Sequence, residues 1–372
     1  MDTRFASPLG RTCCALALLA LLAGCGQRPA PQSVAQSGPP SSVIVVGAPP
    51  NSTHTPTPFQ PLPITPTLAP TERPTQAPTR ELPTAVPLAT ATSIPTNWVG
   101  YPGPVIYPPL AIPNPVGRLP QPDNQINILL LGSDQRPYDS GFRTDTIILV
   151  TLNSELKTVT MTSFPRDLYV YIPGWTMERI NAAFRYGGFE TLAMTMEYNF
   201  GVRPDHYALV NFKGFITLID ELGEIDVEVG ETLTDHRDNK GQYTVQAGTV
   251  RMDGETALWY VRSRYSSSDF DRGRRQQEVL LAIFKKILSL DGVRGAAALY
   301  DRFDEIVQTD IGLLDVVGIA PLAAQIDPGN IRRYSVGPDL VTPWINPYNG
   351  AQVLLPNLSL TTQMMREALN IK

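Results

Sequence analysis

Four short blocks of charged residues carry the chemistry available to this sequence. They are LLLGSDQR at 129–136, FRTDT at 142–146, SFPRD at 163–167, and the stretch from VRSR to DRGRRQQ at 261–277. The chain as a whole has a net charge of −5, yet residues 262–275 contain five arginines and only two aspartates. Arginines beside paired carboxylates suit a polyanion that shares its site with a divalent cation, and a diphosphate is the simplest such polyanion.

Two of the aspartates lie where neighbouring strands are expected to meet. Asp134 closes the apolar run 126–131, and Asp145 opens the next apolar run, 146–152. A loop between adjacent strands would bring both carboxylates to one end of the sheet. Carboxylate oxygens are hard ligands that suit Mg²⁺, or Mn²⁺, shared with substrate phosphates. The alternative is structural, with an Asx-turn at Asp134 and an Asp145–arginine ion pair.

The arginines fall into two sets separated by a turn of seven residues. Arg262 and Arg264 are two residues apart and would project from one face of a strand, which we expect over 257–264. Arg272, Arg275 and Gln276 would share one face of a helix. Together they would present four guanidinium groups and an amide to one point. The alternative is a solvated basic surface paired with Asp269 and Asp271.

Scarcity of other reactive side chains excludes several classes of site. All three cysteines, at 13, 14 and 25, precede the globular part, so that part has no disulfide, cysteine metal site or cysteine nucleophile. Only three histidines occur, at 54, 206 and 236, and no G-x-S-x-G elbow is present. A zinc site or a serine hydrolase triad is therefore not expected.

The first 122 residues read as targeting and spacing segments. Residues 1–24 contain arginines before a short apolar run, which is typical of a signal peptide, and LAGC at 22–25 resembles a lipobox that would lipidate Cys25. An ordinary signal peptide or an uncleaved anchor is the alternative. Residues 25–122 are dominated by Pro, Thr, Ser and Ala and are expected to form an extended, disordered spacer. The apolar stretch 98–107 within it would pack on the domain as an arm.

Globular composition begins at about residue 123 and predicts one α/β domain over 123–337. Strands are expected at 126–131, 146–152, 159–163 and 225–229, and helices at 189–200, 212–222 and 272–290. The glycines at 201 and 223 would end the first two helices. This order predicts a three-layer α/β/α domain with a central mixed sheet. Residues 338–372 would add a C-terminal extension, with an irregular proline-rich opening and a short helix, that packs on the domain.

The ordered set GSDQR, RTDT, SFPRD, RINAAF, VRSR and D-x-x-R-x-x-R-Q-Q resembles the LytR–CpsA–Psr family of cell-envelope glycopolymer transferases. The match covers residues 123–290. The resemblance implies an extracytoplasmic enzyme that moves a teichoic-acid-like or capsular glycopolymer from a polyprenyl diphosphate carrier to peptidoglycan. It also implies a polyprenyl tail held in an apolar groove between the sheet and helices, for which the helices at 189–200 and 212–222 are the candidate walls.

The resemblance assigns roles to residues by motif. Asp134 and Asp145 would hold Mg²⁺, Arg143 would contact the diphosphate, and Arg166 would support it. The remaining clamp would be Arg262, Arg264, Arg272, Arg275 and Gln276. Asp134, Asp145, Arg143 and Arg275 are the expected catalytic residues, and the general base stays unassigned.

Three departures from the family pattern stand out. Arg179 replaces a lysine, Glu224 replaces the second of two paired glycines, and a lipid on Cys25 would replace the usual membrane helix. The lipid would keep the protein at the outer face of the cytoplasmic membrane, because two acyl chains anchor a protein stably.

Two alternative functions use the same site. A diphosphatase would hydrolyse the lipid-linked diphosphate with water, and a non-catalytic module would hold anionic polymer or lipid headgroups. Binding of nucleic acid is not expected, since an exported chain meets no chromosome and the arginine run lacks interleaved stacking aromatics.

Overall fold

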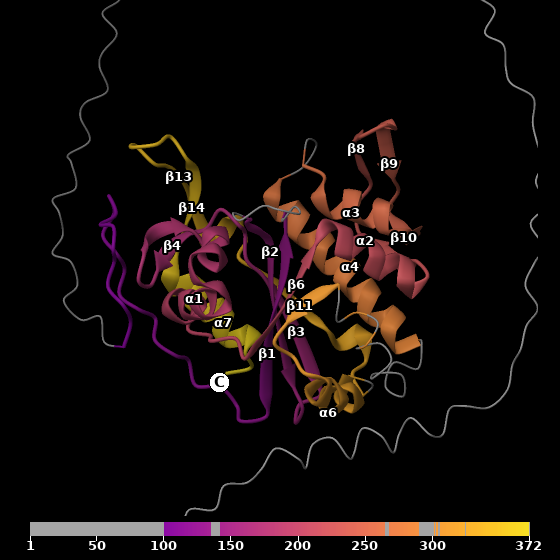
Figure 1. Cartoon of the computed structure of the whole chain (residues 1–372), viewed down its shortest axis with the longest axis horizontal. Coiled ribbons are helices and arrows are strands. Elements are labelled where there is room, and N and C mark those ends of the chain that lie inside the picture. Colours follow the sequence, from indigo (N-terminus) through magenta and orange to yellow (C-terminus); the bar gives the residue numbers. More distant parts are fainter. Residues whose placement is uncertain are drawn as a thin grey trace, which may run out of the picture. The chain divides into compact units, whose positions relative to one another are not determined.

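A six-stranded mixed sheet forms the centre of the described domain (Figure 1). The computed structural model describes residues 100–371, apart from 135–141, 265–267, 290–300, 302, 304–305 and 324. In this part of the chain the strand order is β11-β6-β1-β2-β3-β12, with β1 parallel to β6 and antiparallel to β2. The strands are β1 (Gln125–Ser133), β2 (Thr144–Asn153), β3 (Thr158–Ser163), β6 (His206–Asn211), β11 (Val307–Thr309) and β12 (Arg332–Ser335).

The central strands are covered differently on their two faces. Along β1, every second residue is buried, including Leu129 and Leu131, while the residues between them, including Leu130, are half-buried. Because side chains alternate across a strand, the buried and half-buried residues belong to opposite faces. The structure therefore covers β1 fully on one face only.

Helices α1 (Ala183–Phe200) and α7 (Leu358–Ala368) close the fully buried face (Figure 1). Leu192 and Met196 of α1 and Met365 of α7 join Leu129 and Leu149 of the sheet in one apolar core. Gly201, which follows α1, and Gly223, which follows the helix Phe212–Leu222, have the positive φ of 73° and 75° expected for helix-terminating glycines.

The other face is covered by α2 (Phe212–Leu222), α3 (Gly254–Arg262) and α4 (Asp269–Ser289), together with β7 (Ile225–Val229) and β10 (Gly248–Met252). A hairpin of β8 (Leu233–Arg237) and β9 (Gly241–Val245) extends from this layer (Figure 1). Ile219, Val227, Tyr260 and Val279 belong to an apolar core that is made within this layer. The three-layer α/β/α architecture with a central mixed sheet is therefore confirmed.

The strand predicted over 257–264 is wrong, because these residues end helix α3. Asp253 caps the helix by accepting the Thr256 amide at 2.7 Å, and Ala257, Tyr260 and Val261 bury one helical face. The β-branched and aromatic residues of LWYV favoured a strand, but tertiary burial at helical spacing outweighs that preference.

The ends of the described part pack on the domain. Residues 100–122, which composition assigned to the spacer, lie against it: Val105 N–H donates to the Trp175 carbonyl at 2.9 Å, and Ile112 and Leu119 are buried. The signal peptide 1–24, Cys25 and the spacer up to residue 99 lie outside the described residues. The C-terminal segment opens with an antiparallel hairpin, β13 (Val341–Ile345) and β14 (Gln352–Pro356), in place of the expected irregular stretch.

Shorter elements complete the part of the chain that the structure describes. They are β4 (Tyr169–Ile172), β5 (Thr176–Arg179), the 3₁₀ turns η3 (Ile180–Ala182), η4 (Pro328–Asn330) and η5 (Pro338–Leu340), and α6 (Leu313–Ala323). No helix in this part is both long enough and apolar enough to span a bilayer.

Glu224 adopts a backbone conformation that usually requires glycine. Its φ is 63°, and its side chain accepts from Arg251 Nε at 2.7 Å. This is the position where the family resemblance expects a glycine, so the altered turn keeps the left-handed backbone.

Candidate active site

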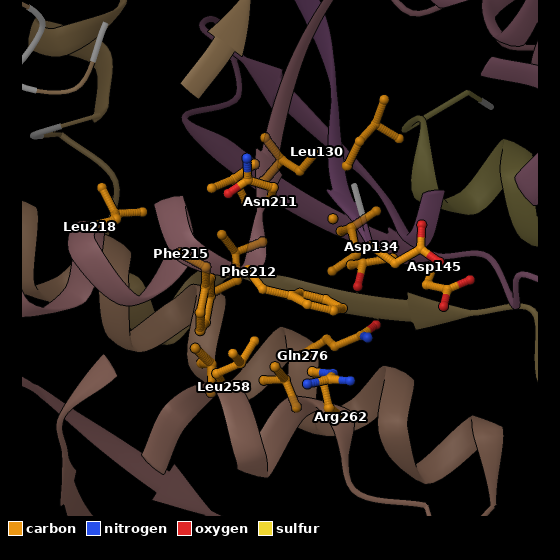
Figure 2. A pocket seen from close by; sticks show the side chains of 18 of the residues that line it. Leu130, Asp134, Asp145, Asn211, Phe212, Phe215, Leu218, Leu258, Arg262 and Gln276 are labelled. Atoms are coloured by element: carbon orange, nitrogen blue, oxygen red, sulfur yellow. The ribbon is translucent and has the colours of Figure 1, made fainter. Parts of the chain in front are cut away.

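A pocket of about 700 Å³ separates the sheet from the layer of α2, α3 and α4. One end carries the charged side chains, and the rest is mainly apolar, with Asn211 as a polar exception (Figure 2). The charged end is lined by seven of the residues singled out in the sequence: Asp134, Asp145, Arg166, Arg262, Arg264, Arg272 and Gln276. They come from the end of β1, from β2, from the segment after β3, from the end of α3 and the residues after it, and from α4, so distant parts of the chain meet there.

A β-bulge places the two aspartates. Thr146 pairs with Gly132 and Thr144 pairs with Ser133, which leaves Asp145 between them without a partner in the strand register. The pairing continues past β1, because the Arg143 amide donates to Asp134 Oδ1 at 2.8 Å. Both carboxylates therefore reach the same end of the pocket (Figure 2).

Arg166 connects the aspartates of the sheet with those of α4. Its guanidinium lies 2.8 Å from Asp145 Oδ2, 3.6 Å from Asp167 and 3.8 Å from Asp269. Burial alone would lower the pKa of Arg166, but the three carboxylates outweigh it and raise that pKa. Arg166 is thus held as a fixed cation.

Arg272 is held in a similar way on the helix side. It is almost fully buried and donates to Asp269 Oδ2 at 2.8 Å. Desolvation lowers the pKa of Arg272 from its ordinary value despite the attraction of Asp269. A buried guanidinium at the wall of a pocket gains from a second anionic partner, and a phosphate would supply one.

Arg262 and Arg264 have a different environment. Both are exposed, and within the described part of the chain neither has a carboxylate oxygen within 4.0 Å. The Arg262 guanidinium lies 4.1 Å from the centre of the Phe212 ring, a cation–π contact that leaves its N–H groups available. Figure 2 shows Arg262 and Gln276 across the pocket from Asp134 and Asp145.

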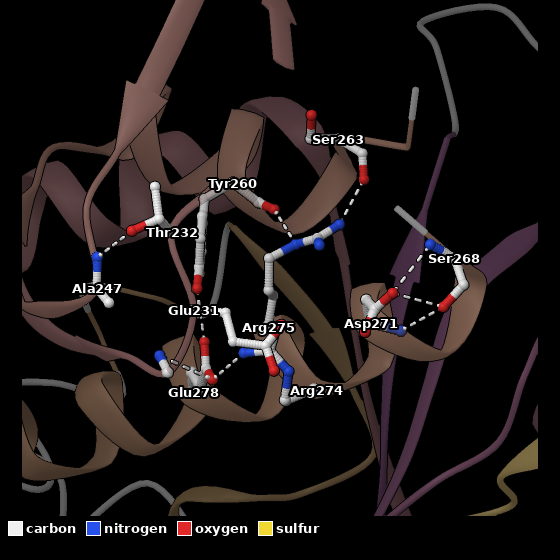
Figure 3. Close-up of polar contacts among 11 residues, drawn as sticks. Glu231, Thr232, Ala247, Tyr260, Ser263, Ser268, Asp271, Arg274, Arg275 and Glu278 are labelled. Atoms are coloured by element: carbon white, nitrogen blue, oxygen red, sulfur yellow. Dashed lines mark hydrogen bonds and ion pairs between the residues drawn. The ribbon is translucent and has the colours of Figure 1, made fainter. Parts of the chain in front are cut away.

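The structure does not bring Arg275 into the pocket, and its assignment to the phosphate clamp is corrected. Only 1 % of Arg275 is exposed. Its Nε donates to the Tyr260 carbonyl at 2.9 Å and its Nη2 donates to the Ser263 carbonyl (Figure 3). Helical spacing placed Arg272, Arg275 and Gln276 on one face, but three residues advance a helix by only 300°. Arg275 therefore turns toward α3 while Arg272 and Gln276 line the pocket.

Arg143 occupies the rim. Its side chain is exposed and is not among those that line the pocket, while its backbone pairs with Asp134. Residues 135–141, which precede it, lie outside the described residues.

The apolar walls are only partly those expected. Phe215 and Leu218 of α2 line the pocket, as predicted for 212–222, but α1 lies on the opposite face of the sheet and contributes nothing to it. Leu258 of α3 and Leu280 and Ile283 of α4 supply the remaining helical wall. The sequence of α4 could have predicted this wall, because Arg272 and Gln276 are followed on the same helical face by an apolar stripe. From Arg272 to Ile283 this stripe is ~16 Å long at the helical rise per residue.

Two further residues position the aspartates and arginines: Asn181, which the sequence did not single out, and Asp269, which was expected only as a surface ion-pair partner of the arginines. Asn181 donates from Nδ2 to Asp145 Oδ1 at 3.3 Å, and Asp269 contacts both Arg166 and Arg272. Asn181 lies in the RINAAF block and Asp269 opens D-x-x-R-x-x-R-Q-Q, so both motifs were visible without these roles.

Asp134 and Asp145 are the two carboxylates that line the described pocket, and carboxylate oxygens are ligands that suit Mg²⁺. No group of three or more histidine, cysteine or acidic side chains suited to a metal occurs among the described residues. Asp134 and Asp145 therefore supply two hard ligands at most. Mg²⁺ commonly takes one or two carboxylates and completes its octahedron with substrate phosphates and water.

Comparison with known proteins identifies relatives of the chain. The LytR_cpsA_psr family model matches residues 110–366. Polyisoprenyl-teichoic acid–peptidoglycan teichoic acid transferase TagT of Bacillus subtilis is 34% identical over 210 residues, which cover 55% of this chain and 65% of TagT. Regulatory protein MsrR of Staphylococcus aureus is 37% identical over 168 residues, covering 45% of this chain and 50% of MsrR. The chain thus matches half to about two thirds of the length of these relatives.

Solved structures agree with the fold. B. subtilis TagV is similar with a TM-score of 0.58 and 26% identity, over 68% of this chain and 99% of TagV. TagT bound to LIIa-WTA is similar with a TM-score of 0.55 and 28% identity, over 70% of this chain and 97% of TagT.

Proposed function

The chain belongs to the LytR_cpsA_psr family, and we propose that it transfers a glycopolymer from a polyprenyl diphosphate carrier to peptidoglycan outside the cytoplasmic membrane. The names of its relatives support this reaction class, because TagT is a teichoic acid transferase that acts on peptidoglycan. The polymer is proposed as a teichoic-acid-like or capsular glycan phosphate.

The observation that carries the proposal is the joining of two chemistries in one cavity. Charged residues at one end, including Arg264 and Arg272, face a diphosphate, and the apolar stripe through Leu280 and Ile283 suits an isoprenoid chain. A soluble sugar nucleotide would leave the apolar part empty, while a plain lipid would leave the arginines without a counter-charge. A lipid diphosphate satisfies both ends.

The side chains divide the work of the reaction. Arg262, Arg264, Arg272 and Gln276 bind the diphosphate oxygens, and Arg166 supports the same charge from the sheet side. The acceptor hydroxyl forms a bond to the phosphorus that carries the glycan, and the bond from that phosphorus to the polyprenyl phosphate breaks. The arginines stabilise the charge that gathers on the departing phosphate. The hydroxyl proton leaves to a base that stays unassigned.

Asp134 and Asp145 would hold Mg²⁺, which would neutralise phosphate charge in the bound complex. An aspartate that holds a cation is a weak base, which argues against either carboxylate as the proton acceptor. Because two carboxylates complete so little of the metal's shell, we expect Mg²⁺ to bind measurably only together with a diphosphate.

Lipidation of Cys25 is proposed as the anchor. A diacylated cysteine followed by a long proline-rich segment would keep the pocket close to a membrane-bound donor while letting it reach the wall.

A reconstituted transfer assay tests the function. The purified chain would be given a polyprenyl diphosphate-linked glycan, Mg²⁺ and peptidoglycan, and the products separated by mass spectrometry. The proposal expects a covalent glycan–peptidoglycan adduct and one polyprenyl phosphate for each transfer. Release of polyprenyl phosphate without an adduct would establish a diphosphatase, and binding without any release would establish a non-catalytic module. Either of these results overturns the proposal.

A further inference from the structure

One buried residue separates Arg262 and Arg264, two pocket arginines that have no carboxylate oxygen within 4.0 Å among the described residues. Arg262 is the last residue of α3, and Ser263 then leaves the helix with an extended backbone, at φ −56° and ψ 133°. Arg262 and Arg264 both line the pocket, while Ser263 does not and is 7% exposed. The extended conformation of this one residue therefore turns Arg264 back toward the same side as Arg262.

Ser263 is anchored through each of its polar groups. Its amide donates to the Trp259 carbonyl at 2.9 Å, which is the last turn of α3. Its hydroxyl donates to Asp235 Oδ2 on β8, and its carbonyl accepts from Nη2 of Arg275 on α4. Asp235 is 3% exposed and Arg275 is 1% exposed, so these bonds lie away from solvent.

The anchors are themselves held in place (Figure 3). Arg275 also binds the Tyr260 carbonyl at 2.9 Å, so its positive charge lies at the C-terminal, negative end of the α3 dipole. The Tyr260 hydroxyl donates to Glu278 at 2.7 Å, and Glu278 accepts from Arg274 at 2.7 Å. These bonds tie the end of α3 to α4, which also carries Arg272 and Gln276.

We propose that Ser263 is a positioning residue that, held by Asp235 and Arg275, sets the direction in which Arg264 enters the pocket beside Arg262. This inference rests on the proposed function, since it assigns how the diphosphate clamp is preorganised. Two neighbouring guanidinium groups repel each other, and an unanchored arginine samples many rotamers. A fixed backbone at Ser263 holds Arg264 beside Arg262 despite this repulsion and narrows the directions that the Arg264 side chain can take toward the phosphate position.

Ser263→Ala tests the proposal with minimal disturbance. It removes the hydroxyl bond to Asp235 and leaves Arg262, Arg264 and Arg275 intact. The matched control is Thr234→Ala, which removes an exposed hydroxyl of the same β8 strand that pairs with Thr244 Oγ1 at 2.8 Å. Affinity for farnesyl diphosphate would be measured by calorimetry with Mg²⁺ present, and thermal unfolding would be followed for each variant.

We expect Ser263→Ala to weaken farnesyl diphosphate binding roughly tenfold, the effect of one charge-assisted hydrogen bond, while Thr234→Ala binds like the unaltered protein. The readout specific to positioning is a double-mutant cycle. In an Arg264→Ala background, Ser263→Ala should weaken binding less than about twofold, because its effect acts through Arg264.

Two results would overturn the inference. One is unchanged affinity in Ser263→Ala, and the other is an equal loss in both backgrounds, which would indicate a general structural role. Failure of the unaltered protein to bind farnesyl diphosphate would instead remove the proposed function, and the inference with it.

Discussion

On one face of the sheet, α1 and α7 pack directly against the strands, whereas on the other face α2, α3 and α4 pack against one another and against β7 and β10. The first arrangement gives a core that contains Leu129 and Leu149 of the sheet. The second gives a core around Tyr260 and Val279 that contains no residue of the central sheet. The space left between this second core and the sheet is the pocket.

Polar contacts join α4 to the sheet, while α6 covers another part of the same face with the apolar side chains of Ile319 and Leu322. Gln277 of α4 donates to Ser163 Oγ at 2.8 Å and to the Tyr334 carbonyl at 2.7 Å. At the charged end, Arg166 reaches Asp269 across the same gap. The comparison shows that a layer can be held at a distance from a sheet when its core is its own and its connections are hydrogen bonds and ion pairs.

Loss of a carboxylate from the pocket face of the sheet should have the largest effect. Asp145→Ala deletes a proposed metal ligand and releases Arg166 and Asn181, so we expect transfer to fall by about 100- to 1,000-fold. Asp226→Ala, an exposed aspartate of β7, is the control. Rates with the lipid-linked donor, compared with circular dichroism of each variant, check the prediction. Normal transfer by folded Asp145→Ala would contradict it.

Neighbouring residues of β1 provide a stability test of the two faces. Leu129 is fully buried in the core under α1, and Leu130 lines the pocket. Leu129→Ala should lower the free energy of unfolding by about 2–5 kcal/mol, because it leaves a cavity in a closed core. Leu130→Ala should lower it by less than half as much, because its surroundings are already open. Urea unfolding of both variants measures the difference, and equal losses would show that the faces are packed alike.

Several elements of the fold and part of the candidate site were predictable from the sequence. The strands 126–131 and 146–152, the helices at 212–222 and 272–290, and the clustering of Asp134, Asp145, Arg166 and Arg272 follow from apolar periodicity and motif position. These features depend on residues close together in the chain, or on motifs whose order is fixed.

The errors came from tertiary packing. Residues 257–262 are helical because Asp253 caps them and their buried face meets α4, which the β-like composition did not reveal. Arg275 turns to the α3 carbonyls because an offset of three residues on a helix leaves a 60° difference, and only the neighbouring helix decides which side it faces. Likewise α1 has an apolar face suited to a groove, but the sheet topology puts it on the closed side.

A bulky side chain in the apolar part of the pocket should show whether the two ends of the pocket bind different parts of the ligand. Leu280 is half-buried in the apolar wall, so Leu280→Trp would fill part of the groove beyond the arginines. We expect affinity for farnesyl diphosphate to fall about tenfold, close to the loss of one or two buried methylene contacts, with inorganic pyrophosphate binding unchanged. Calorimetry with the two ligands gives both values. Equal weakening for both ligands would contradict a groove that is reserved for the lipid.

The smallest expected change in unfolding free energy comes from removing the helix cap at the start of α3. Asp253 accepts the Thr256 amide at 2.7 Å. Hydrogen bonds with the Thr256 side chain and then with its amide lower the pKa of Asp253, and partial burial opposes this shift only in part. A lowered pKa in the folded state means that the carboxylate stabilises the fold above its unfolded pKa, and that this contribution is lost as pH falls through the folded value. Asp253→Ala should therefore lower the free energy of unfolding by about 1 kcal/mol at pH 7, with a smaller difference near pH 3. Urea unfolding at both pH values tests the sign. Asp253→Asn keeps a capping oxygen, so it should lose less unfolding free energy at pH 7 than Asp253→Ala. Its own unfolding free energy should lack the pH dependence that titration of Asp253 contributes. If the difference in unfolding free energy between the unaltered protein and Asp253→Ala grew as the pH fell, the Asp253 carboxylate would not stabilise the start of α3. The cap would then have no part in holding the second core away from the sheet.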